Sequence, residues 1–243
     1  MASISETGHA KNVANFQDLI EFVTGYGETY NPSKASLKLP QLIALKASAE
    51  NNLADVISKN TNYNSKVNER INAFSGLKSL STRLVNALQT TDATPQTVND
   101  AKGFNRKMQG KKASSEQSQT DPNAPAPTTI STSQQSYDQL IQHLAGLTSV
   151  LEAETSYQPN EVELKVGTIQ TLVADLTAKN TAVATAYASI SNSRIARNET
   201  LYSATTGLVE TANEVKKYIK SVFGASSPQF AQVKGIEFKK PKI

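Results

Sequence analysis

The side chains with the most capacity for chemistry are the two histidines, His9 and His143. His9 lies in a polar N-terminal stretch, whereas His143 lies 121 residues after Phe22, at a matching position on the face of a predicted helix. Metal binding or acid–base catalysis would need further ligands at fixed spacing, as in HExxH or a pair of Glu-x-x-His motifs. The sequence has neither pattern. We therefore interpret both histidines as structural, and we predict no catalytic residue and no metal ligand.

Carboxylates, hydroxyls and thiols give no stronger signal. Glu152, Glu154, Glu161 and Glu163 flank a turn, and we interpret them as solvated charges that also suit a helix N-terminus. Serine and threonine are abundant, but no base is placed to activate one, and no GxGxxG or Walker loop occurs. The chain has no cysteine, which excludes thiolate chemistry. The sequence predicts a protein that is not an enzyme and that binds no cofactor.

A basic segment near the C-terminus is the best candidate for contact with a partner. It alternates apolar and polar residues like a short strand or an extended docking arm. Such a segment suits an acidic protein, a nucleic acid or an anionic lipid; the alternative is an ordinary charged terminus. The candidate partner-binding residues are Lys234, Phe238, Lys239, Lys240 and Lys242.

Two long stretches repeat apolar residues every three or four positions, from Ala35 to Leu88 and from Val162 to Val222. We call them the first and the second seam. An average spacing of 3.5 residues keeps one narrow stripe facing a partner helix, which is typical of a coiled coil. Hydrophobic residues make up 38% of the chain and aromatic residues 6%, with no Trp. This composition favours paired helices over a thick globular core.

Each seam is predicted to be one long helix. From Pro40 to about Thr90 the first seam would span about 75 Å at 1.5 Å per residue. Poor helix formers lie at Asn60–Asn64 and at Ser189–Ser193, and a bend there would give a conventional bundle of hairpins. Because the heptad phase passes through both points without Gly or Pro, we predict continuous helices.

Five seam positions hold polar side chains where apolar ones are expected. A buried Asn in a seam lowers stability but fixes register and oligomeric state, since misaligned pairing leaves it without hydrogen bonds. Two of the five are arginines 127 residues apart, which fits a shared polar layer; the alternative is that the seam turns these side chains toward solvent. The candidate register-setting residues are Asn60, Arg70, Asn180, Arg194 and Arg197.

The two halves of the chain carry the same landmarks in the same order. Tyr30-Asn-Pro32 matches Tyr157-Gln-Pro159, and Pro95-Gln96 matches Pro228-Gln229. We predict a tandem duplication with pseudo-two-fold symmetry, each copy having a short helix, a Tyr-x-Pro turn, a long helix and a basic tail. The predicted divisions are a disordered lead-in (1–11), a first helical repeat (12–110), a flexible Ser/Thr/Gln/Pro linker (111–135) and a second helical repeat with the basic C-terminal tail (136–243).

These patterns predict an all-α fold, an elongated helical bundle that resembles a coiled coil, and a non-enzymatic structural or interaction protein. We expect a helical rod that self-associates or scaffolds partners through its seams, the partner being a second copy or another helical protein. A net charge of +4 gives no reason to expect nucleic acid. A membrane-interacting helical protein is one alternative, which the narrow stripe disfavours, and a bundle that binds a small ligand is another. The absence of a signal-peptide or transmembrane pattern predicts a cytoplasmic location.

Overall fold

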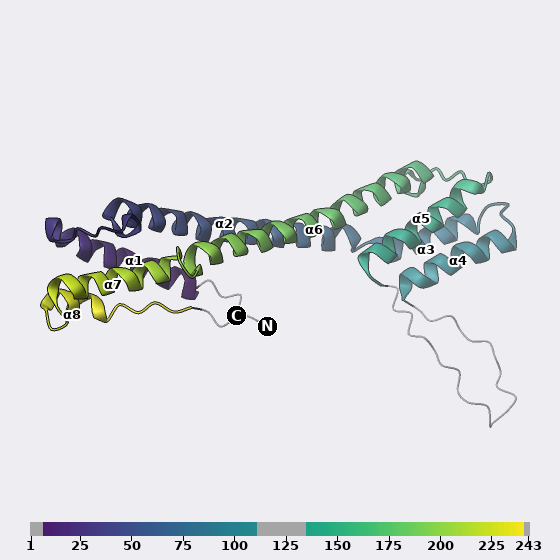
Figure 1. Cartoon of the computed structure of the whole chain (residues 1–243). Coiled ribbons are helices and arrows are strands. Elements are labelled where there is room, and N and C mark those ends of the chain that lie inside the picture. The colour runs from purple at the N-terminus through teal and green to yellow at the C-terminus, as the bar shows by residue number, and fades with distance from the viewer. Residues whose placement is uncertain (1–6, 111–134, 241–243) are drawn as a thin grey trace, which may run out of the picture. The chain divides into compact units, whose positions relative to one another are not determined.

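Helices are the main structure of the protein over the residues that the computed structural model describes, which are 7–110 and 135–240 (Figure 1). No strand occurs in these two ranges. The predicted all-α class is therefore confirmed. The helices are α1 (Thr7–Gly25), α2 (Leu39–Phe74), α3 (Leu77–Leu88), α4 (Pro95–Gln109), α5 (Tyr137–Ala153), α6 (Val166–Tyr202), α7 (Leu208–Phe223) and α8 (Pro228–Lys234), with 3₁₀ turns η1 (Gly27–Thr29), η2 (Ala35–Leu37) and η3 (Val162–Leu164).

The helices form two compact units. Among the described residues, unit 1 comprises 7–63 and 186–240, and unit 2 comprises 64–110 and 135–185. Unit 1 contains α1, the first part of α2, the last part of α6, α7 and α8. Unit 2 contains the last part of α2, α3, α4, α5 and the first part of α6. Each unit thus draws on both halves of the chain. The predicted division into two repeats stays a prediction, and residues 111–134 of the predicted linker lie outside the described ranges.

The long helices α2 and α6 run without a break through the stretches of poor helix formers. α2 passes through Asn60–Asn64 and α6 passes through Ser189–Ser193, so continuity at these two points is confirmed. Near these stretches Ser193 of α6 donates to Asp55 of α2, and the rings of Tyr63 and Tyr187 pack together. Such tertiary contacts outweigh weak intrinsic helix propensity.

Both long helices end earlier than predicted. α2 ends at Phe74, ahead of Gly76, and α6 ends at Tyr202, ahead of Gly207. A Cβ added to Gly207 would lie 2.5 Å from the backbone nitrogen of Ser203, so the chain turns here in a way that only glycine accommodates. Each seam is therefore a long helix followed by a separate shorter one. At 1.5 Å per residue, the 36 residues of α2 span about 54 Å, not the predicted 75 Å.

The predicted disordered lead-in is wrong for residues 7–11, which belong to α1. The side chains of His9 and Asn12 are buried, and both form hydrogen bonds with the hydroxyl of Tyr202 at the end of α6. These long-range contacts fix a polar stretch that local sequence alone would leave frayed. Residues 1–6 lie outside the described ranges.

The two Pro-Gln segments begin helices, α4 and α8, that the sequence analysis did not assign. Thr94 and Ser227 are the N-caps, and each hydroxyl accepts a hydrogen bond from a backbone N–H three residues later. Pro95 and Pro228 then occupy the first turn, where a missing N–H costs nothing. A hydroxyl residue followed directly by proline was the available signal for both starts.

Each unit has its own apolar core. In unit 1, Phe16 and Leu19 of α1 pack in one cluster with Leu42 of α2 and with Leu208 and Val215 of α7. The core of unit 2 joins α3, α4, α5 and α6 through residues that are almost completely buried: Leu84, Leu88, Met108, Leu144, Leu147 and Leu176. Both cores therefore combine side chains that are far apart in the sequence.

Candidate interaction site

The clearest polar cluster on the seam lies in unit 2, where α2, α5 and α6 meet. Arg70 of α2 donates a hydrogen bond from Nη1 to the Oδ1 of Asn180 of α6, at 2.9 Å. The Nδ2 of Asn180 donates to the Oδ1 of Asp138 at 2.7 Å. Two of the five predicted register-setting residues are thus in direct contact, and Asp138 is a third member that the heptad pattern did not identify. We call Arg70, Asn180 and Asp138 the seam triad.

The environment of Arg70 explains how a cation is held beside an apolar core. Its guanidinium lies over the ring of Tyr137, with the Cζ atom 4.0 Å from the ring centroid. Tyr137 in turn packs edge-on against Phe74, at 4.7 Å between centroids. The ring face and the Asn180 oxygen replace part of the lost hydration, while the buried Nε has no hydrogen-bond partner among the described residues. A shift in register would separate the half-buried Arg70 from these partners and leave its charge less well compensated.

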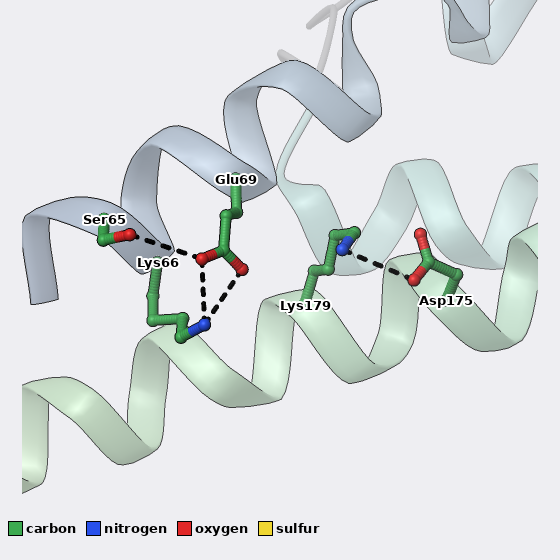
Figure 2. A network of polar contacts seen from close by, with 5 residues as sticks. All are labelled: Ser65, Lys66, Glu69, Asp175 and Lys179. Atoms are coloured by element: carbon green, nitrogen blue, oxygen red, sulfur yellow. Dashed lines mark hydrogen bonds and ion pairs between the residues drawn. The ribbon is translucent and has the colours of Figure 1, made fainter. Parts of the chain in front are cut away.

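Ion pairs flank the seam triad on the same two helices (Figure 2). The carboxylate of Glu69 on α2 accepts hydrogen bonds from Lys66 and Ser65, and on α6 the Nζ of Lys179 lies 3.5 Å from the Oδ1 of Asp175. The hydrogen bond from Lys66 is the main cause that lowers the pKa of Glu69, and the charges of Lys66 and Lys179 also lower it. These groups are solvent-exposed, so each pair adds little stability. They extend the polar pattern of the triad along both helices.

In unit 1, α2 and α6 also pair antiparallel. Asn52 donates to Thr200 and Ser193 donates to Asp55, each at 2.7 Å. The rings of Tyr63 and Tyr187 lie 5.8 Å apart. Residue numbers thus fall along α6 as they rise along α2, which settles the orientation of this pairing.

The other three candidate register residues, Asn60, Arg194 and Arg197, lie in unit 1. Arg197 is only 5% exposed, and its guanidinium donates to the side chain of its neighbour Asn198. It is therefore not turned to solvent. Arg194 is half-buried, and its buried Nε has no hydrogen-bond partner among the described residues. The arginines 70 and 197 lie in different units and each forms contacts within its own unit.

The C-terminal segment docks on its own chain. The side chain of Asn12 on α1 donates to the carbonyl of Lys239 at 2.8 Å and accepts from its N–H at 3.0 Å. Asn15 donates to the carbonyl of Glu237 at 2.6 Å, and Phe238 packs edge-on against Phe16. Residues 236–240 follow α8 without helix or strand, and their main chain and Phe238 form contacts within unit 1, while binding of a partner by this segment stays a prediction.

Some of the lysines in this region form ion pairs or hydrogen bonds within unit 1, and others are exposed. Lys240 lies 3.7 Å from Glu210, and Lys216 of α7 donates to the carbonyl of Ile236 while lying over the ring of Phe238. Burial lowers the pKa of Lys216, and the charge of Glu237 opposes this shift. Exposed Lys234 lines a surface groove between α7 and α8. Lys242 lies outside the described residues.

Each Tyr-x-Pro turn contains the same buried hydrogen bond. The hydroxyl of Tyr30 donates to the carbonyl of Leu37 at 2.8 Å, and the hydroxyl of Tyr157 donates to the carbonyl of Leu164 at 2.9 Å. In both cases the tyrosine is buried and ties the turn to the 3₁₀ segment before the long helix. Burial is the main cause that raises the pKa of Tyr157, to about 12, and the charge of Glu161 adds to it. Sequence reasoning found the motif but not this role of its hydroxyl.

The histidines occupy different environments. The Nδ1 of His9 and the hydroxyl of Tyr202 share a hydrogen bond of 2.7 Å. His143 is buried in α5, and its Nε2 has no hydrogen-bond partner among the described residues. Burial, followed by the charge of Lys107 on α4, lowers the pKa of His143. Residues 7–110 and 135–240 contain no group of three His, Cys, Asp or Glu side chains able to hold a metal ion.

Several large apolar side chains remain exposed on the long helices. On α2 in unit 1, Ile43 is 50% exposed and Ile57 is 60% exposed, and the two lie fourteen residues apart. Two heptads separate them, so they share one face of the helix, together with exposed Ala47, Glu50 and Ala54. This face, which we call the α2 stripe, lies in solvent beside the buried face that carries Leu42 and Val56.

Among the described residues, no helix is both long and apolar enough to cross a bilayer. Comparisons with protein-family models, curated protein sequences and solved structures find no match.

Proposed function

We propose that the protein is a non-enzymatic interaction protein, whose paired long helices bind a second copy of the chain or another helical protein. The observation that carries this proposal is the α2 stripe. Its spacing of two heptads is the spacing that a partner helix requires, and large aliphatic side chains half or more exposed favour contact with a partner. Tyr187 and Ile195 of α6, 59% and 64% exposed, add apolar surface in the same unit.

The proposal includes a tandem duplication as the origin of the chain. Two local structures that occur in both halves support it: the Tyr-to-Leu hydrogen bond and the hydroxyl-capped helix that begins with proline. The order of the elements, which is the same in both halves, supports it as well. In each half a helix leads to a buried tyrosine, a 3₁₀ turn, a long helix, a glycine break and two shorter helices. Chance convergence on one order with the same capping chemistry is improbable.

The test is the mass of the protein in solution as a function of concentration. We expect light scattering after size exclusion to give more than the monomer mass at tens of micromolar. We expect the double variant Ile43→Glu/Ile57→Glu to be a monomer with unchanged helix content, because it removes both large apolar contacts and adds two charges whose burial is costly.

Ser48→Glu is the matched control, because Ser48 is exposed on the same helix about 180° from Ile57. It should self-associate like the unaltered chain. A protein that stays monomeric over the whole concentration range would contradict self-association. Equal masses for the stripe variant and the control would exclude the α2 stripe as the contact.

A further inference from the structure

The two halves of the chain interlock, because neither half contains a complete unit. The first half supplies α1 and most of α2 to unit 1, and the rest of α2, α3 and α4 to unit 2. The second half supplies α5 and the start of α6 to unit 2, and the end of α6, α7 and α8 to unit 1. Either half alone would leave the apolar faces of two partial units exposed.

The contacts between the halves are core contacts in both units. In unit 1, Phe16 and Leu42 from the first half share a cluster with Leu208 from the second. In unit 2, Leu84 and Met108 from the first half share a cluster with buried side chains of the second half, such as Leu144 and Leu176. These side chains are at most 1% exposed, so separating the halves would expose them to water.

The halves are joined at a helical hairpin in unit 2. α4 and α5 pack antiparallel, with Phe104 against Gly146. At the open end of the hairpin the side chain of Gln135 contacts Gly110 and donates to the carbonyl of Lys107 at 2.6 Å. The two ends of the connection are therefore adjacent. A closed chain needs only a few residues here, whereas the sequence has 24 between them.

We propose that the halves, 12–110 and 136–243, are obligate partners, and that the chain self-associates by exchange, the first half of one copy pairing with the second half of another. This inference rests on the proposed self-association and gives it a route that does not use the α2 stripe. Exchange forms no new type of contact, because each core is rebuilt from the same residues of a second copy. Both forms bury the same cores, so the share of the exchanged form increases with protein concentration. A connection too short for the hairpin to close leaves exchange as the way to bury both cores.

The experiment uses three forms of the full chain, measured by light scattering and circular dichroism. In the first form, a protease site placed within residues 111–134 is cut after folding. We expect both fragments to elute together at the mass of the intact chain, with unchanged helix content. Fragments that separate under native conditions would overturn the proposal, because halves that fold independently need no exchange.

In the second form, residues 110–136 are deleted, so that α4 continues directly into α5 and the hairpin cannot close. We expect a twofold increase in mass. The third form is the matched control, in which a six-residue Gly/Ser loop replaces residues 111–134; it should have the mass of the unaltered chain at micromolar concentration. A folded monomer from the deletion would overturn the proposal. Should the deletion prevent folding, the cut chain decides alone.

The outcome is separable from the test of the α2 stripe. If Ile43→Glu/Ile57→Glu abolishes self-association while the deletion variant stays monomeric, the interaction function stands and exchange is excluded. If the deletion variant doubles in mass and the stripe variant associates like its control, exchange is supported and the stripe is excluded as the contact.

Discussion

His143 shows how one buried side chain makes the stability of unit 2 depend on pH. Its imidazole lies on the buried face of α5, opposite Lys107 of α4. Both burial and the lysine charge oppose protonation, so its pKa in the folded protein lies below its ordinary value near 6.5. The unfolded chain therefore binds the proton more readily than the folded one.

We predict that the melting temperature falls as the pH is lowered through 6.5 toward the reduced pKa of His143, and that this contribution is complete above pH 6.5. The measurement is thermal unfolding by circular dichroism at pH 7.5 and at pH 5.5. His143→Leu removes the titrating group and should reduce the difference between the two melting temperatures. His9→Leu is the comparison, because it replaces the histidine of unit 1 and leaves His143 in place. An equal difference in the unaltered chain and in His143→Leu would contradict this role.

The seam triad illustrates a residue-scale feature that the sequence indicates only in part. The heptad pattern identified Arg70 and Asn180 because a polar residue at an apolar position stands out. It could not identify Asp138 or Tyr137, since both lie on a different helix and at no irregular position. Contacts of this kind depend on where a third helix packs, which the periodicity of two helices does not specify.

At the scale of helices, the sequence identified the long elements and missed their ends. Heptad spacing predicted α2 and α6, because 3.5-residue periodicity reports a buried stripe directly. The same spacing wrongly predicted that each helix continues across Gly76 or Gly207. The apolar period persists there because a new helix, α3 or α7, begins in the same phase after the break. Helix ends depend on single residues and their caps, so a periodic pattern does not locate them.

The two helical glycines of the α4–α5 hairpin give a prediction about packing. A Cβ added to Gly146 would lie 2.4 Å from the Phe104 ring, whereas a Cβ added to Gly103 would meet no atom within 4 Å. We predict that Gly103→Ala stabilises the protein by about 0.5–1 kcal/mol, because alanine is the better helix former. Gly146→Ala should lower the free energy of unfolding by about 1 kcal/mol, because displacement of the ring outweighs the same gain.

Urea unfolding of both variants, followed by circular dichroism, measures these changes. Each substitution is the control for the other, since both replace a glycine within a helix of the same hairpin. Stabilisation by Gly146→Ala equal to that by Gly103→Ala would show that α5 does not approach Phe104 as closely as the structure has it.

At the scale of the whole molecule, the division into units does not follow the division of the sequence into halves. Landmarks such as Tyr30 and Tyr157 are visible in the sequence because they recur. Which half covers which core is not visible, because a heptad seam fits any seam of similar phase, within the half or outside it. The structure assigns α1 and α7, from opposite halves, to one core. That pairing determines which helices a destabilising substitution in one unit should loosen.

We therefore predict that Tyr30→Phe acts on unit 1 and spares the rest of its own half. The substitution leaves the buried carbonyl of Leu37 without its donor, and it should lower stability by about 1–2 kcal/mol. Hydrogen exchange followed by mass spectrometry should show faster exchange in α1 and in α7, whose Tyr218 packs edge-on against Tyr30. Helices α3 and α4, which belong to unit 2, should keep their protection.

Tyr157→Phe is the matched control and should give the converse pattern, with faster exchange in α3, α4 and α5 because Tyr157 belongs to their core. Faster exchange in α3 and α4 after Tyr30→Phe, with α7 unchanged, would mean that each half folds by itself, contrary to the interlocked arrangement.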